Sequence, residues 1–201
     1  MSGMNAKFTF LLPFICLWTM STTGHTQNAR ETAFVGQPLI YSKSGKIDGC
    51  GVRLIAIDES SNADGPRLVI DASLQLSTRW QAMVVKATAG RMLLENGKLQ
   101  NRKIATVERA WFRADGLPPT KAVTGKMIST IDPVGGVIYP TTRLEDLEIL
   151  IAMTSGKPIE MGLKLRGEPT ETVWFGVVTL STGESARIDS CLKELLEDRT
   201  K

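Results

Sequence analysis

The sequence predicts an α+β domain that is mainly β: an antiparallel, sandwich-like sheet with one short helix and a C-terminal helix packed on it. Apolar residues occupy every second position from Leu68 to Leu76, as in a strand with one buried face. Asn96-Gly97 separates two strand-like segments, which indicates a hairpin because this pair favours a type I′ turn. Near the C-terminus, apolar residues recur at helical spacing.

The other strands are predicted from short apolar or alternating segments between turn residues. Cys50, Val52, Leu54 and Ala56 share one face of such a segment, and Ile55 with Ile57 lies on the other, so we expect both of its faces to be covered. Five further strands are expected at Met83–Ala87, Ile104–Phe112, Val123–Ile131, Ile159–Leu165 and Thr172–Leu180.

The first helix is expected between Thr142 and Gly156. Thr142 and Glu145 form a capping-box pattern, and Gly156 followed by Pro158 is a stop pattern. The expected buried stripe is Leu144, Leu147, Leu150 and Ile151. Alternating apolar residues leave a strand as the other interpretation of this segment.

The C-terminal helix is expected to begin at a second capping box, Ser181 with Glu184. Its narrow apolar face would dock on the sheet, because propensity alone does not stabilise so short a helix. The residues of that face are Ile188, Cys191, Leu192, Leu195 and Leu196.

Residues 1–25 have the pattern of a secretory signal peptide. Lys7 precedes a 13-residue apolar core, Phe8–Met20, and a small, polar stretch follows it. A membrane-spanning helix needs about 20 residues, so we predict cleavage between Thr23 and Ala29 and export to the periplasm or beyond the cell. Residues 26–36 are expected to be a flexible mature N-terminus, and residues 37–201 one β-rich domain.

The cysteines fit an exported protein. Cys16 lies inside the leader, and Pro13 and Ile15 depart from a lipid-anchor motif, so no membrane anchor is expected. Cys50 and Cys191 have one possible intramolecular pairing, and we predict that disulfide. Two free thiols or an intermolecular bridge are the alternatives.

Composition and motifs exclude several function classes. The precursor has a formal charge of +3, and loss of Lys7 leaves +2, a balance that does not indicate nucleic acid or an anionic membrane as a partner. The single histidine, His25, lies at the cleavage region, so no histidine-dependent catalytic or zinc site is expected in the domain. No catalytic residue, metal ligand or cofactor is predicted.

One possible partner-binding surface is Val107–Pro119. Trp111 and Phe112 are neighbours on a predicted strand and must point to opposite faces. Arg109 and Arg113 share the face of Trp111, and arginines around an aromatic side chain are common at binding hot spots. Core packing of these aromatic residues is the alternative interpretation.

Two functions therefore remain. The first is a non-enzymatic binding or accessory protein of the cell envelope, stabilised by one disulfide. The second is a saccharide hydrolase that uses a pair of carboxylates. Two acidic side chains facing one cleft beside an exposed tryptophan would favour the hydrolase.

The C-terminal third also resembles a known family in layout. The segment from Asp146 to Lys157, Asp-Leu-Glu-Ile-Leu-Ile-Ala-Met-Thr-Ser-Gly-Lys, is followed by strands, Thr179-Leu-Ser and a final helix carrying Cys191. This order resembles the invasion-associated locus B group of exported proteobacterial proteins. The resemblance implies a non-enzymatic envelope or surface role and supplies no active-site residues.

Overall fold

The computed structural model of the chain describes residues 29–58, 65–95, 98–122, 128–129, 135–141 and 145–197. As the sequence predicts, the protein is α+β and mainly β, with eleven strands and two helices in these residues. The strands are β1 (Ala29–Glu31), β2 (Phe34–Lys43), β3 (Lys46–Asp58), β4 (Arg67–Ser77), β5 (Ala82–Glu95), β6 (Lys98–Ala105), β7 (Val107–Ala114), β8 (Ile128–Ser129), β9 (Val137–Thr141), β10 (Pro158–Leu165) and β11 (Thr172–Thr179). The helices are α1 (Glu145–Thr154) and α2 (Thr182–Glu197).

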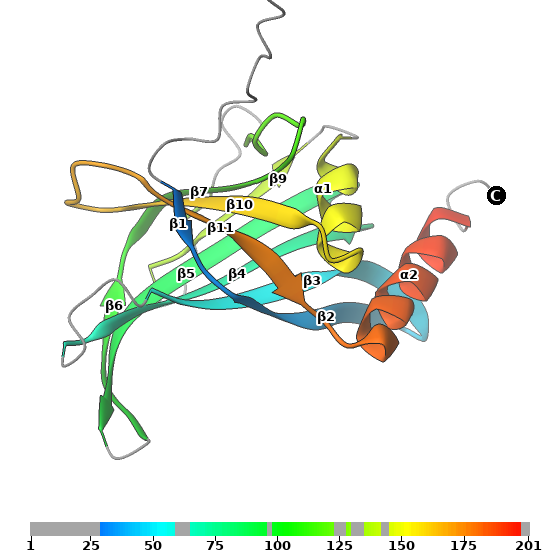
Figure 1. The fold of residues 1–201 in the computed structure, drawn as a ribbon. Helices are drawn as coiled ribbons and strands as arrows, with labels where there is room; N and C mark the ends of the chain where they lie inside the picture. The colour runs from blue at the N-terminus through cyan, green and yellow to red at the C-terminus, as the bar shows by residue number, and fades with distance from the viewer. Residues whose placement is uncertain are drawn as a thin grey trace, which may run out of the picture.

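The strands form one curled sheet in the order β7-β10-β11-β2-β3-β4-β5-β9-β8, with β1 beside β11 and β6 beside β5. Figure 1 shows two layers, with β7, β10 and the start of β11 over β2 to β5. β11 links the layers because it pairs with β10 and β1 near its start and with β2 at its end. Alternate side chains of both layers point inward and form a single core.

The predicted alternation in β3 and β4 is confirmed on the inner side. Cys50, Val52 and Leu54 are almost fully buried, and Leu54 lies opposite Ala72 in the antiparallel register. The expectation that both faces of β3 are covered is wrong, because the Ile57 side chain is 43% exposed. No described element packs over that end of the outer face.

Tertiary pairing changes three predicted strands. β5 is longer than expected because one half pairs with β9 and the other with β6. The Asn96-Gly97 turn lies outside the described residues, although the β5–β6 pairing beside it is present. The segment expected as one strand, 104–112, divides at Thr106, where the chain leaves β5 and joins β10. Of the strand expected at 123–131, the described part is β8.

Side chains close the outer edge of β7. The Tyr139 hydroxyl donates to the Ala110 carbonyl at 2.6 Å, and Thr120 Oγ1 lies 3.1 Å from the same hydroxyl. Thr120 Oγ1 also accepts from the Phe112 N–H, and the Thr120 N–H donates to the Phe112 carbonyl. β7 therefore offers little free backbone to another strand, which limits edge-to-edge association.

Helix α1 lies between the layers at one end of the molecule, against β10, β7 and β3 (Figure 1). Its helical nature is confirmed, but the predicted stripe is partly wrong. Ile149, Leu150 and Met153 are buried, whereas Ile151 is 47% exposed because it faces away from the sheet. Leu144 and the cap residue Thr142 lie outside the described residues.

Helix α2 packs on β2 and β3 and begins at the predicted capping box. Ser181 donates its backbone N–H and its hydroxyl to Glu184 Oε2, each at 2.8 Å. The buried face contains Ile188, Cys191, Leu192 and Leu195. Leu196, which the sequence also assigned to that face, is exposed. Neither helix has the length and apolarity to span a membrane, as far as the described residues extend.

The structure corrects the predicted N-terminal boundary of the folded domain. Residues 29–36 were expected to be flexible, but β1 pairs with β11 in parallel and Phe34 is fully buried. Residues 26–28 lie outside the described part, as does the whole predicted leader. The strand is missed because its partner lies near the other end of the sequence, and a three-residue parallel strand has no local pattern.

Candidate functional site

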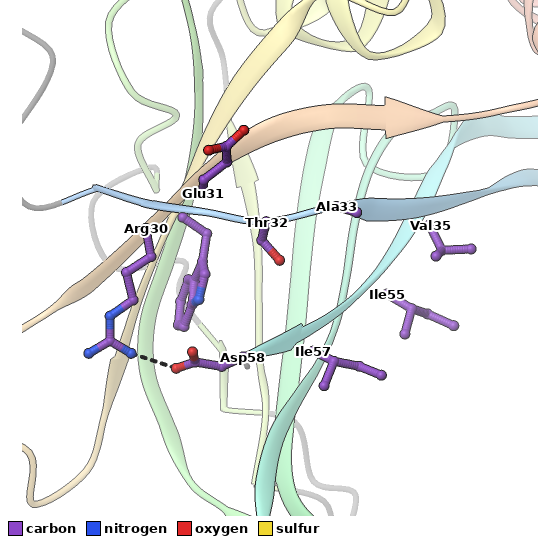
Figure 2. Close-up of a pocket in the computed structure, with 9 residues that line it drawn as sticks. Arg30, Glu31, Thr32, Ala33, Val35, Ile55, Ile57 and Asp58 are labelled. Carbon is purple, nitrogen blue, oxygen red and sulfur yellow. Dashed lines mark hydrogen bonds and ion pairs between the residues drawn. The ribbon is translucent and has the colours of Figure 1, made fainter. Parts of the chain in front are cut away.

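A groove lies between β1 and the end of β3. β2 pairs with β3 from Val35 onward, but β1, just before it in the chain, pairs with β11 and not with β3. The resulting gap has a volume of about 330 Å³. Figure 2 shows the two strands diverging with side chains from both around the gap. The groove is lined by Arg30, Glu31, Thr32, Ala33, Val35, Ile55, Ile57, Asp58 and Trp174.

The close approach of this segment to β11 requires a glycine. The Thr32 N–H donates to the Phe175 carbonyl at 2.9 Å, which holds the segment between β1 and β2 against β11. A Cβ atom at Gly176 would lie 2.0 Å from the Thr32 carbonyl oxygen, closer than any normal contact. Gly176 therefore permits the close approach of the two backbones and, through it, the divergence that opens the groove.

The walls of the groove are apolar. Val35 and Ile57 are 54% and 43% exposed, and Ile55 between them is half-buried. Figure 2 shows these three side chains on one side of the two strands. Trp174 is 1% exposed and also lines the groove. Its indole N–H is buried and has no hydrogen-bond partner in the described part of the chain.

Two of the three charged side chains at the groove, Arg30 and Asp58, compensate each other. Arg30 Nη1 donates to Asp58 Oδ2 at 2.6 Å, and the Asp58 side chain is largely buried. Glu31 is exposed, and its carboxylate points away from Asp58 (Figure 2). Hydrolysis of a glycosidic bond requires two carboxyl groups that face each other across the site. The side chains of Glu31 and Asp58 do not have this arrangement.

Arg109, Trp111 and Arg113, the residues predicted to bind a partner, lie together on the outer face of β7. Phe112 between them is fully buried, so the predicted alternation is confirmed. The Trp111 indole N–H donates to Glu171 Oε1, and Arg109 donates to Glu171 Oε2 at 2.9 Å. Arg113 is paired with the buried Glu160 at 2.5 Å and lies over the Trp111 ring. A partner would compete with these contacts, and binding at this surface stays a prediction.

Trp111 rests on a neighbouring glycine. Gly162 stands opposite Trp111 in the β7–β10 register. A Cβ at Gly162 would lie 2.1 Å from the indole ring. The ring is therefore half-buried against the sheet, with Arg113 over it, and does not project freely into solvent.

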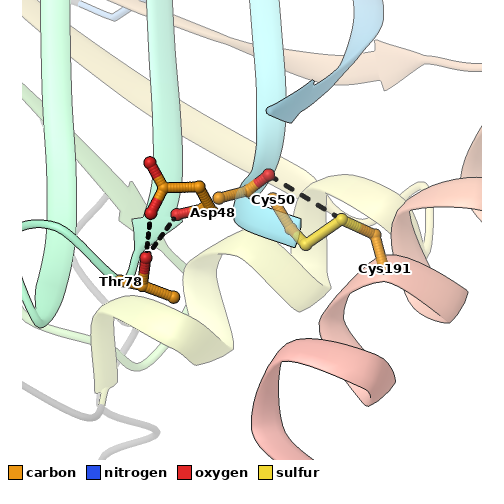
Figure 3. Close-up of a disulfide and its surroundings, with 5 residues drawn as sticks. Asp48, Cys50, Thr78 and Cys191 are labelled. Carbon is orange, nitrogen blue, oxygen red and sulfur yellow. Dashed lines mark hydrogen bonds between the residues drawn. A yellow bond between two sulfur atoms is a disulfide. The ribbon is translucent and has the colours of Figure 1, made fainter. Parts of the chain in front are cut away.

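The predicted disulfide is present. Cys50 and Cys191 are bonded, with their Cα atoms 5.9 Å apart (Figure 3). The bridge joins the buried face of α2 to β3, and both cysteines are buried. Beside it, the Thr78 hydroxyl and N–H both donate to Asp48, which fixes the turn after β4 to the start of β3. The disulfide links the two ends of the domain, and the Thr78–Asp48 bonds link two neighbouring strands.

A larger cavity, of about 470 Å³, lies between α1 and the ends of β7 and β10. Asp115, Glu148 and Lys157 stand at its rim, and Ile151 supplies exposed apolar surface. We favour the smaller groove as the functional site because it combines apolar walls with a buried, unpartnered N–H group. The described residues contain no cluster of three or more acidic, histidine or cysteine side chains suited to a metal ion.

Sequence reasoning missed the groove because its walls come from four strands. Only the two isoleucines on the second face of β3 pointed toward it, and they were interpreted as covered. Comparison with protein-family models, curated proteins and solved structures finds no match to this chain.

Proposed function

We propose that the protein is an exported, non-enzymatic binding protein of the cell envelope and that the groove between β1 and β3 is its binding site. The groove itself is the observation that carries the proposal. It is a concave site with apolar walls and a few polar groups, the usual composition of a binding site. The signal-peptide pattern and the disulfide are compatible with export. The layout resemblance to invasion-associated locus B proteins supports the same role.

Binding energy at this site would come mainly from apolar burial. Val35 and Ile57 leave about half of their side-chain surface in water, and covering it contributes about 25 cal/mol per Å². The Trp174 N–H can supply direction, because a buried donor without an acceptor costs about 1–3 kcal/mol and an acceptor on the ligand would remove that cost. The Arg30–Asp58 pair adds no net charge, so an uncharged ligand group fits best.

Partner capture with matched lysine variants tests the proposal. Tagged protein is recovered from the exported fraction of cells, and the bound components are quantified by mass spectrometry. Ile57→Lys should lower recovery of the cognate partner by about tenfold. Val177→Lys should leave recovery unchanged, because Val177 has the same 43% exposure on β11 but does not line the groove. Equal recovery by the two variants would contradict the proposal.

A further inference from the structure

β3 extends past β2 at the groove. The last pair between these strands joins Val35 with Ile55, whereas β3 continues beside β4 to the pair of Asp58 with Leu68. The backbone N–H and C=O groups of successive strand residues face opposite edges. Beyond Ile55, the backbone N–H and C=O groups on the β2 side of β3 therefore have no strand opposite them. Ile57 supplies these groups, because Asp48 faces β4 through its bond from Thr78 and residues an odd number of positions from it face the other edge.

β1 presents a second unpaired edge to the same groove. The Thr32 N–H donates to the Phe175 carbonyl, so Thr32 faces β11, and Arg30, two residues earlier, faces the same way. Glu31 lies between them and must direct its N–H and C=O away from β11. No described backbone group forms a hydrogen bond with Glu31 on that side.

A strand inserted between these two edges needs a gap of two strand spacings. Adjacent strands lie about 4.8 Å apart, so a missing strand leaves its neighbours about 10 Å apart. Across this gap the two walls are joined by the long Arg30 side chain, which reaches Asp58 at 2.6 Å. Figure 2 shows this ion pair crossing between the diverging strands.

We propose that the groove binds an extended, uncharged segment of a partner polypeptide, which inserts between β1 and β3 as an additional strand. This inference rests on the proposed binding function. Strand addition to an exposed edge is an established mode of peptide recognition, in which main-chain bonds give affinity and side-chain pockets give specificity. A small apolar molecule would cover Val35 and Ile57 but would leave both backbone edges without partners. The peptide's outward side chains lie beside these two residues and are therefore apolar.

A proline substitution isolates the backbone contribution. Glu31→Pro removes the N–H that faces the groove and leaves the bonds of Arg30 and Thr32 to β11, and proline is tolerated at such an edge position. Glu31→Ala is the matched control, because it removes the same side chain and keeps the N–H. Thr32→Pro is the opposite control, because it removes the donor to Phe175 and should destabilise the fold.

The probe is a displayed library of random heptapeptides, selected on the tagged protein recovered from the exported fraction. Selected peptides should bind Glu31→Pro about tenfold more weakly than Glu31→Ala. Melting curves check that both variants fold. If Glu31→Pro does not fold, N-methylation of the selected peptide at alternate positions provides the equivalent test on the unmodified protein.

The outcomes separate the two proposals. Equal binding by Glu31→Pro and Glu31→Ala, or binding that withstands N-methylation at every position, would show recognition of side chains alone and overturn strand insertion. A library that yields no peptide able to distinguish the unmodified protein from Ile57→Lys would also overturn it. Capture of the cognate partner that is lost in Ile57→Lys and kept in Glu31→Pro would refute strand insertion and leave the binding function standing.

Discussion

Tyr139 shows how one side chain holds the edge of the sheet. Burial raises the pKa of the Tyr139 phenol above its ordinary value, so the hydroxyl stays protonated and donates to Ala110. Tyr139→Phe leaves this buried carbonyl without its donor, which should lower the free energy of unfolding by about 1–3 kcal/mol. Urea denaturation measures the loss. Tyr41→Phe is the control because Tyr41 is 49% exposed, and equal midpoints for the two variants would contradict the role of Tyr139.

The contact between Gly162 and Trp111 is a second determinant at the scale of single residues. Gly162→Ala places a methyl group within the space of the indole ring and should displace Trp111 from Glu171. Overpacking of this kind costs about 1–3 kcal/mol, which thermal denaturation will show. At Gly183 an added Cβ meets no atom within 4 Å, so Gly183→Ala should not destabilise the protein. An unchanged melting temperature for Gly162→Ala would refute the close contact.

Helix α2 is the element whose stability should depend on pH through its cap. Hydrogen bonds from the Ser181 backbone N–H, and then from its hydroxyl, hold the pKa of Glu184 below its ordinary value of 4.5. The cap therefore contributes its full stability above pH 4.5 and loses it as the pH falls through the lowered pKa. Glu184→Gln should lack this dependence, so its unfolding midpoint should approach that of the unmodified protein in acid. Glu194→Gln, on the exposed side of α2, is the control and should keep the pH dependence of the unmodified protein. The prediction would be contradicted if the unfolding midpoints of Glu184→Gln and the unmodified protein changed in parallel with pH.

At the scale of the whole molecule, the disulfide joins positions 141 residues apart in the sequence. A cross-link over so long a loop restricts the unfolded chain, and removal of a native disulfide typically costs about 2–5 kcal/mol. Cys50→Ser or Cys191→Ser should lower the unfolding midpoint accordingly, and reductant should have the same effect on the unmodified protein. The double serine variant should not respond to reductant. Two alkylatable thiols in oxidised native protein would contradict the pairing.

Local sequence patterns predicted the parts of the fold that depend on residues close in sequence, and those where only one chemical pairing is available. Alternation predicted β4, the capping box predicted the start of α2, and elimination left one cysteine pair. The prediction that both faces of β3 are covered was wrong at Ile57. The alternation pattern places this apolar side chain on the second face but does not show whether another element covers it. β1 was missed because parallel pairing with β11 depends on the whole fold.

The candidate site could not be predicted for the same physical reason. Trp174 is buried, and whether its side chain also lines a groove depends on where β1 and β3 separate. Trp111 was chosen because arginines surround it in the sequence. Those arginines are paired with Glu160 and Glu171, which stand on or beside other strands.

Strand β1 has a consequence for the motions of the protein. It contributes three residue pairs with β11, whereas β4 is paired with β3 from Leu68 to Ser77 on one side and with β5 along its full length on the other. Short, peripheral segments open locally at a lower free energy than the global transition. The backbone amides of β1 should therefore exchange with deuterium well before those of β4. An occupant of the groove that pairs with Glu31 should slow exchange there, so the rate of isotope uptake at the beginning of the domain would report occupancy even where the bound and free forms have the same average structure.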